Sequence, residues 1–134
     1  MLKGKTAIVT GGTRGIGYAI VKKFLANGAS VALFGSRQET VDKALSALKE
    51  ENPEYPVMGL CPDLTDPEAV AAAFAQVKEK FGSLDILANN AGISSSTPLC
   101  DYKPGEFEKI MNLNVTAVYV CCQAAARIMK EQEG

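Results

Sequence analysis

Short apolar runs alternate with longer amphipathic stretches along the chain. Four runs, at 6–10, 30–34, 56–60 and 84–88, consist almost wholly of aliphatic and other uncharged residues. Strands of a parallel sheet are covered on both faces, so their sequences are continuously apolar rather than alternating. The four runs therefore predict the strands of a parallel sheet.

Apolar residues recur at helical spacing between these runs. The stretches at 16–25, 41–48 and 70–81 place their apolar residues three or four positions apart, which is typical of amphipathic helices. A fourth stretch, from 104 to about 131, predicts one long helix or a bent pair, and it follows an open loop at 94–98. Strands that alternate with helices indicate right-handed crossovers and an α/β fold.

Three residues predict where helices begin and end. Asp66, which is followed by proline, is a favourable N-cap for the third helix. Gly28 and Gly82 stand where a helix commonly ends in a left-handed residue.

Composition narrows the class of protein. The 134 residues suffice for one domain, and 47% of them are hydrophobic, as in ordinary globular proteins. Lysine and arginine number 14 against 15 aspartates and glutamates, so the net charge of −1 argues against general attraction to nucleic acid or an anionic membrane. Histidine is absent, which excludes histidine bases and histidine metal ligands within the chain.

Membrane, secretion and metal signals are not expected either. The longest apolar run, 69–75, is far shorter than the ~20 residues of a membrane helix, and no signal-peptide core precedes the first strand. Cys61, Cys100, Cys121 and Cys122 form no C-x-x-C pair. We therefore expect buried, reduced thiols, no metal site and a cytoplasmic location.

A glycine-rich turn joins the first strand to the first helix. Residues 10–17 read T-G-G-T-R-G-I-G, with a G-x-x-x-G-x-G spacing. Free backbone N–H groups and the positive end of a helix dipole suit a dinucleotide pyrophosphate, and glycine lets the backbone approach it. Gly17 would also let the helix pack closely on the sheet. The alternative is a flexible turn that binds nothing.

Three further motifs follow this turn along the chain. They are Asp63 within 61–66, the sequence N-N-A-G at 89–92, and Asn114 within 111–115. Together with the turn, they resemble the motifs of the classical short-chain dehydrogenase/reductase family. Shorter runs are similar to those of bacterial bile-acid hydroxysteroid dehydrogenases: 11–17, 41–45, 62–65 and 114–116. The resemblance implies that residues 1–134 are the N-terminal half of a Rossmann-type, doubly wound domain, with strand order 3-2-1-4 and without its C-terminal strands.

The resemblance also implies an oxidoreductase that transfers a hydride between NADP or NAD and a secondary alcohol or ketone. The residues that would bind the cofactor are Gly11, Thr13, Arg14, Gly15, Ile16, Gly17, Ser36, Arg37, Asp63, Leu64, Asn90, Ala91 and Gly92. Asp63 would accept a hydrogen bond from adenine, and Asn114 would take the catalytic position that helps to hold a water for proton transfer. Simpler roles remain open: a turn or cap for Asp63, sheet support for 90–92, and a helix kink for Asn114.

The end of the second strand favours NADP over NAD. A carboxylate there would bind both ribose hydroxyls and repel a 2′-phosphate. The chain instead has Ser36 and Arg37, with no acidic residue before Glu39, and Arg37 can pair with a phosphate. In the family, Arg14 lies across the same pocket. The alternative for Arg37 is a solvated loop charge.

The family's catalytic serine and Tyr-x-x-x-Lys pair lie beyond the segment that matches this chain. Tyr18 and Lys22 have the spacing of the pair, but they lie in the first helix, where the family has no catalytic pair. We therefore expect cofactor binding without turnover by this chain alone. The alternative is a non-catalytic nucleotide-binding or assembly fragment. The unpaired fourth strand and the long last helix predict a homo-oligomer.

Overall fold

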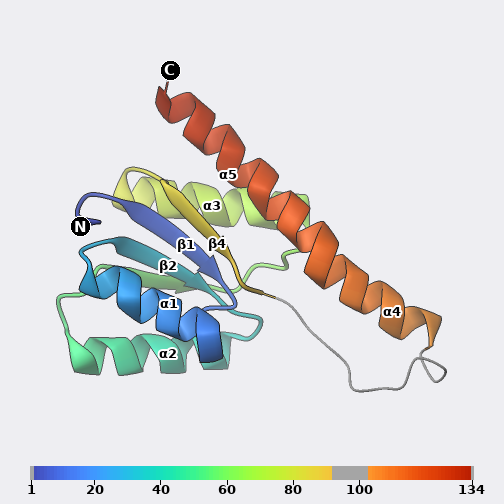
Figure 1. The fold of residues 1–134 in the computed structure, drawn as a ribbon, viewed down its shortest axis with the longest axis horizontal. Helices are drawn as coiled ribbons and strands as arrows, with labels where there is room; N and C mark the ends of the chain where they lie inside the picture. The colour runs from blue at the N-terminus through green and yellow to red at the C-terminus, as the bar shows by residue number, and fades with distance from the viewer. Residues whose placement is uncertain (1, 92–102, 134) are drawn as a thin grey trace.

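Four parallel strands form one sheet in the computed structural model, which describes residues 2–91 and 103–133 (Figure 1). The strands are β1 (Thr6–Thr10), β2 (Ser30–Phe34), β3 (Val57–Leu60) and β4 (Ile86–Asn89). Their order is β3-β2-β1-β4, and each neighbouring pair is parallel. The predicted α/β fold and strand order are confirmed, with β3 and β4 at the edges of the described sheet.

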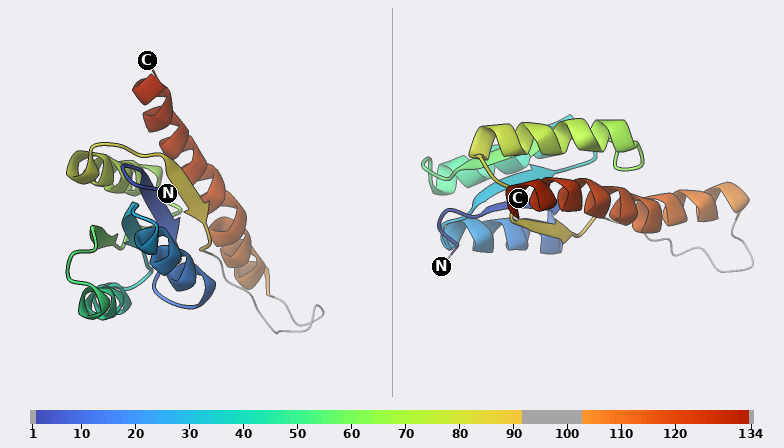
Figure 2. Two further views of the ribbon diagram at one scale, coloured as in Figure 1. Left: turned by 60° about the vertical axis from the view of Figure 1, so that its left-hand side comes forward. Right: turned by 90° about the horizontal axis from the view of Figure 1, so that it is seen from above.

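Helices cover both faces of this sheet. They are α1 (Gly15–Ala26), α2 (Gln38–Glu51), α3 (Pro67–Phe81), α4 (Pro104–Met111) and α5 (Ala117–Glu133). Helices α1 and α2 pack on one face, and α3 and α5 pack on the other. Helices α4 and α5 follow one another as a long rod that extends beyond the sheet (Figure 2).

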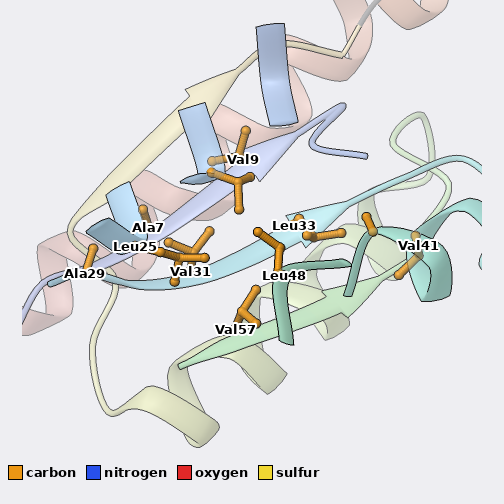
Figure 3. Packing of buried hydrophobic residues seen from close by; sticks show 11 residues of the cluster. Ala7, Val9, Leu25, Ala29, Val31, Leu33, Val41, Leu48 and Val57 are labelled. Carbon is orange, nitrogen blue, oxygen red and sulfur yellow. The ribbon is translucent and has the colours of Figure 1, made fainter. Parts of the chain in front are cut away.

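Alternate strand residues supply the two halves of the core. Val31 and Leu33 of β2 pack with Val9 of β1 in the half that faces α1 and α2 (Figure 3). Ala32 and Phe34 of β2 belong to the other half, which faces α3 and α5. Because both faces are covered, all five residues of β1 are buried, which accounts for the continuous apolar run in the sequence.

The predicted helix ends are confirmed. Oδ1 of Asp66 accepts hydrogen bonds from the amides of Glu68 (3.1 Å) and Ala69 (3.4 Å), and α3 starts at the next residue after Asp66. Gly28 and Gly82 have φ values of +95° and +87°, in the left-handed region that glycine adopts at little cost.

The fourth strand begins later than the apolar run predicts. The run starts at Leu84, but β4 starts at Ile86. The backbone N–H of Leu84 donates to Oε1 of Gln132 (2.7 Å), and Nε2 of Gln132 donates to the carbonyl oxygen of Leu84 (2.8 Å). A side chain from the last turn of α5 therefore binds the backbone that leads into β4.

The long C-terminal stretch is a helix interrupted by one π-helical segment, η2 (Asn112–Thr116), between α4 and α5. A π turn takes in one residue more than an α turn and so shifts the phase of the helix. Met111 and Val115, part of the apolar spacing that predicted this helix, are 42% and 53% exposed. The buried side of α5 consists of Ala117, Val120, Cys121 and Ala125. The stretch is therefore a long helix with one interruption, and Met111 and Val115 are not on its buried side.

The cysteines match the predicted burial only in part. Cys121 is buried, and desolvation together with the neighbouring Cys122 raises its pKa to about 11. Cys61 is half-buried and Cys122 is exposed. Cys100 lies outside the described residues, as do Gly92 and the predicted loop at 94–98.

Residues 2–91 and 103–133 contain neither a membrane-spanning helix nor a metal-binding cluster. No helix there combines the length and apolar character needed to cross a membrane. The same residues contain no group of three or more cysteine, aspartate or glutamate side chains placed to hold a metal ion.

Candidate functional site

A cleft of about 690 Å³ lies at the carboxyl ends of the strands. Its lining residues are Gly11, Thr13, Arg14, Gly15, Phe34, Gly35, Ser36, Cys61, Pro62, Asp63, Leu64, Asn90 and Ala91. This volume falls within the ~300–1,000 Å³ that is usual for small-molecule sites. The cleft begins beside β1 and β4, where the strand order reverses, and this is where open α/β sheets bind ligands.

The turn between β1 and α1 forms one wall of the cleft. Gly11 and Gly15 have φ values of +65° and +60°, which few other residues adopt. A Cβ on Gly11 would lie 3.0 Å from Cα of Ala91, so the two loops approach too closely for a side chain. Arg14 precedes α1 without capping it through its side chain. The Arg14 side chain therefore leaves the first N–H groups of α1 unoccupied, as anion binding requires.

Thr10 and Asn90 connect this turn to the end of β4. Oγ1 of Thr10 accepts hydrogen bonds from the amides of Asn90 and Ala91, both at 3.0 Å. Nδ2 of Asn90 donates to the carbonyl oxygen of Gly11 (3.2 Å). Asn90 and Ala91 also line the cleft, so this loop combines sheet support with a place at the site.

Gly17 lies behind the turn and does not line the cleft. A Cβ at Gly17 would overlap with the carbonyl oxygen of Gly11 and would lie 2.6 Å from Nδ2 of Asn90. Gly17 therefore allows α1 to pack directly against the turn, as its place in the glycine spacing suggested.

Asp63 occupies a turn after β3 and faces the cleft. Its Oδ1 accepts hydrogen bonds from the amide (3.0 Å) and the hydroxyl (2.7 Å) of Thr65. These two hydrogen bonds lower the pKa of Asp63 below its ordinary value, because they stabilise the carboxylate. The helix cap in this segment belongs to Asp66, whereas Asp63 has the turn role and a position at the cleft.

The end of β2 places Ser36 and Arg37 differently. Ser36 lines the cleft, whereas Arg37 is exposed and lies outside its lining. The carbonyl oxygen of Arg37 accepts hydrogen bonds from the Val41 amide (3.1 Å) and the Thr40 hydroxyl (2.9 Å), at the start of α2. Among the lining residues the cation is Arg14, in the turn between β1 and α1.

Two more of the predicted residues lie away from the cleft. Ile16 points into solvent, with 74% of its surface exposed. Asn114 lies in η2, where the helix is π-helical, and it is half-buried. The structure thus gathers most of the predicted residues at one cleft and leaves Ile16, Gly17, Arg37 and Asn114 outside its lining.

The sequence analysis missed four lining residues: Phe34, Gly35, Cys61 and Pro62. All four stand at or just after the carboxyl ends of β2 and β3. The sequence did contain a signal for these four residues, namely their position at the ends of predicted strands. The carboxyl ends of parallel strands meet at one edge of a sheet, which is where ligands bind.

Known proteins share this sequence pattern and this fold. A family model described as short chain dehydrogenase matches residues 5–134. A 3alpha-hydroxysteroid dehydrogenase of Mediterraneibacter gnavus is 63% identical over the whole chain, which covers 54% of that protein. A gluconate 5-dehydrogenase of Gluconobacter oxydans is 38% identical over 96% of the chain, which covers 49% of that protein.

Solved structures agree with these relatives. A short chain dehydrogenase from Burkholderia cenocepacia in complex with NADP superposes with a TM-score of 0.86 at 42% identity, over 95% of this chain and 51% of that one. A putative short-chain dehydrogenase from Novosphingobium aromaticivorans has a TM-score of 0.91 at 32% identity, over 97% of this chain and 48% of that one. The chain spans about half the length of the curated relatives that it matches.

Proposed function

The chain belongs to the short-chain dehydrogenase family, and we propose that it is the cofactor-binding half of an NAD(P)-dependent oxidoreductase. The observation that carries this proposal is the cleft at the carboxyl ends of the strands, between the glycine turn and the segment after β3. Its residues fit a dinucleotide, because open helix N–H groups suit a pyrophosphate and apolar walls with few polar groups suit a base.

Three parts of the cleft would each bind a different part of the dinucleotide. The turn around Gly11 and Gly15 would bind the pyrophosphate, and Asp63 and Leu64 would meet the adenine. Asn90 and Ala91, with Gly92 beyond them, would adjoin the ribose on the nicotinamide side. The nicotinamide, when bound, supplies or accepts the hydride. Asn114 would contribute to proton transfer by holding a water.

The substrate that we propose is a secondary alcohol on a steroid, or the matching ketone. Support comes from the 3alpha-hydroxysteroid dehydrogenase that is 63% identical to this chain over its whole length. The similarity to hydroxysteroid dehydrogenases inferred from the sequence motifs points the same way. The chain covers 54% of that relative, so the substrate pocket of the complete protein is part of the proposal.

We expect NADPH to bind more tightly than NADH. Ser36 lines the cleft, and no acidic residue follows β2 in the sequence before Glu39. Arg14 provides a cation, and the exposed Arg37 adjoins Ser36 in the sequence. Arg37→Ala should weaken NADPH binding by about 1.5–3 kcal/mol, the usual contribution of a hydrogen bond to a charged group, and should leave NADH binding nearly unchanged. Calorimetric titration of both cofactors measures this difference. Arg127→Ala on α5 is the matched control, and equal losses for both cofactors would contradict the NADP assignment.

Turnover by the 134-residue chain is not expected. Tyr18 packs against the core beneath α1 and α2, and Nζ of Lys22 lies 6.0 Å from the centroid of its ring. The same Nζ lies 3.4 Å from Oε2 of Glu51. Lys22 thus contacts Glu51 of α2 as well as the Tyr18 ring, and neither Tyr18 nor Lys22 lines the cleft. An unassisted tyrosine, with a pKa near ~10, is also a poor acid at neutral pH.

An activity assay with a 3-hydroxysteroid and NADP tests this proposal. We expect no turnover from residues 1–134 alone and activity when they are combined with the C-terminal half of a relative. Cofactor binding that never leads to activity, even with the second half, would favour a non-catalytic nucleotide-binding module. A chain that binds neither NADPH nor NADH would favour an assembly fragment.

Self-association is the partner interaction that we propose, in a cytoplasmic setting. Met111, Val115 and Tyr119 recur at intervals of four residues along α4, η2 and α5, and each is more than two-fifths exposed. Exposed apolar residues in such a row commonly mark a protein–protein contact. The open edge of β4 adds a second surface at which chains can associate.

A further inference from the structure

Thr65 holds one carboxylate oxygen of Asp63 at the wall of the cleft. Both the amide and the hydroxyl of Thr65 donate to Oδ1, at 3.0 Å and 2.7 Å. Within the described part of the chain, no hydrogen bond engages the other oxygen, Oδ2. The side chain of Asp63 is exposed to the cleft, so Oδ2 is available to a ligand there.

The turn that contains Asp63 is itself fixed by α3. The amide of Asp66 donates to the carbonyl oxygen of Asp63 (3.0 Å), and the side chain of Asp66 caps α3. Two donors on a single carboxylate oxygen then restrict the rotation of the Asp63 side chain, so the direction of Oδ2 is set before any ligand binds. Thr65 also lowers the pKa of Asp63, which keeps the group ionised and able only to accept hydrogen bonds.

The surroundings of Asp63 are suited to a planar base. Cys61, Pro62 and Leu64 line the cleft on either side of it in the sequence, and Phe34 lines it from β2. Apolar contacts of this kind accept any purine, because every base has a flat apolar face. Selection among purines must therefore come from a polar group at the edge of the base.

We propose that Thr65 is a positioning residue for the adenine of the cofactor: it occupies Oδ1 of Asp63 and thereby aims Oδ2 at the exocyclic 6-amino group. This inference rests on the proposed function, since it assigns a specificity to the same cleft. An acceptor in a fixed direction pairs with a 6-amino group and repels the 6-oxo group of hypoxanthine. The site therefore discriminates between the two purines through a residue that does not itself contact the base.

The test compares two dinucleotides that differ at this group and at the adjacent N1, which is unprotonated in adenine and carries a hydrogen in hypoxanthine. The chain is titrated with NADP and with nicotinamide hypoxanthine dinucleotide phosphate, or with the unphosphorylated pair if that pair binds more tightly. We expect the unmodified chain to prefer the adenine form by about tenfold or more, the ratio that one well-placed hydrogen bond supplies. Thr65→Val, which lacks the hydroxyl but has nearly the same shape, should reduce this preference to about twofold. Thr65→Ser, which retains the hydroxyl, should restore it.

Asp63→Asn provides a second variant that does not depend on the stability of the first. An asparagine keeps an acceptor oxygen for the two Thr65 donors, so its NH₂ group must take the place of Oδ2. A donor in that place should invert the preference in favour of hypoxanthine. A purely structural role for Thr65 would change the unfolding midpoint or weaken both dinucleotides alike, and it would leave their ratio unchanged.

Each outcome decides one of the two proposals. Loss of the preference in Thr65→Val, with recovery in Thr65→Ser and inversion in Asp63→Asn, supports the inference. An unmodified chain that binds both dinucleotides equally, or a Thr65→Val chain with an unchanged ratio, overturns the inference and leaves the proposed function standing. If Thr65→Val does not fold, the Asp63→Asn variant decides: an adenine preference that persists in this variant overturns the inference about Thr65. A chain that binds neither dinucleotide overturns the proposed function itself.

Discussion

Gly17→Ala should destabilise the chain by on the order of 3 kcal/mol and weaken NADPH binding by about tenfold or more. The added Cβ would overlap with the carbonyl oxygen of Gly11 and crowd Nδ2 of Asn90. The first of these groups is backbone and cannot rotate away, so α1 must lift from the turn. That movement would disturb the N–H groups of α1 and the hydrogen bond between Asn90 and Gly11 together. Urea unfolding and a cofactor titration measure the two effects.

Gly105→Ala is the control for this substitution. Gly105 lies in the first turn of α4, and a Cβ built on it has no neighbour within 4 Å. The change should therefore alter stability by less than about 1 kcal/mol, in the stabilising direction that alanine favours in a helix. If Gly17→Ala unfolded at the same urea concentration as Gly105→Ala and bound NADPH equally well, the close packing of α1 on the turn would be disproved.

Phe74→Ala should lower the stability of the fold by about 3–5 kcal/mol, or the thermal midpoint by roughly 10–20 °C. The Phe74 side chain is fully buried on α3 and meets Phe34 of β2 edge to face, with ring centroids 5.6 Å apart and an interplanar angle of 67°. Its removal leaves a cavity in the half of the core that faces α3 and α5. Thermal unfolding followed by circular dichroism measures the loss.

Phe74→Leu distinguishes the contribution of the aromatic ring to stability from the contribution of its apolar volume. Leucine still fills most of the site, so the loss should be less than half that of alanine. Phe34 also lines the cleft, and we therefore expect Phe74→Ala to loosen that wall. An alanine variant with an unfolding midpoint within a few degrees of the unmodified chain would show that Phe74 is not part of a tightly packed core.

The features that the sequence predicted correctly depend on local patterns. Continuous apolar runs located the strands, because burial on both faces removes the need for polar residues. Asp66, Gly28 and Gly82 located helix ends, because a cap depends on the residue and its nearest neighbours alone. The glycine turn could also be predicted from the sequence, because positive φ values and close backbone contacts both require glycine.

The features that the sequence did not predict depend on distant parts of the chain. β4 starts at Ile86 rather than at Leu84, and Gln132, 48 residues away from Leu84, binds the backbone that precedes the strand. The π-helical segment changed which side of α5 is buried, and apolar spacing alone does not distinguish an α turn from a π turn. Arg37 immediately precedes α2 and lies outside the cleft lining, and the sequence pattern does not predict the direction of an exposed side chain.

The side chain of Gln132 substitutes for a neighbouring strand at the start of β4. The amide of Asp85 donates to the carbonyl oxygen of Thr6 in β1 (2.9 Å), so the N–H and C=O of Leu84, one residue earlier, face away from β1. The side-chain amide of Gln132 has a donor and an acceptor like those of a peptide group. It forms hydrogen bonds with both the N–H and the C=O of Leu84. An incoming strand can therefore pair with this edge only beyond Leu84, from Ile86 onward. The last turn of α5 thus limits the registers in which any further strand can extend the sheet.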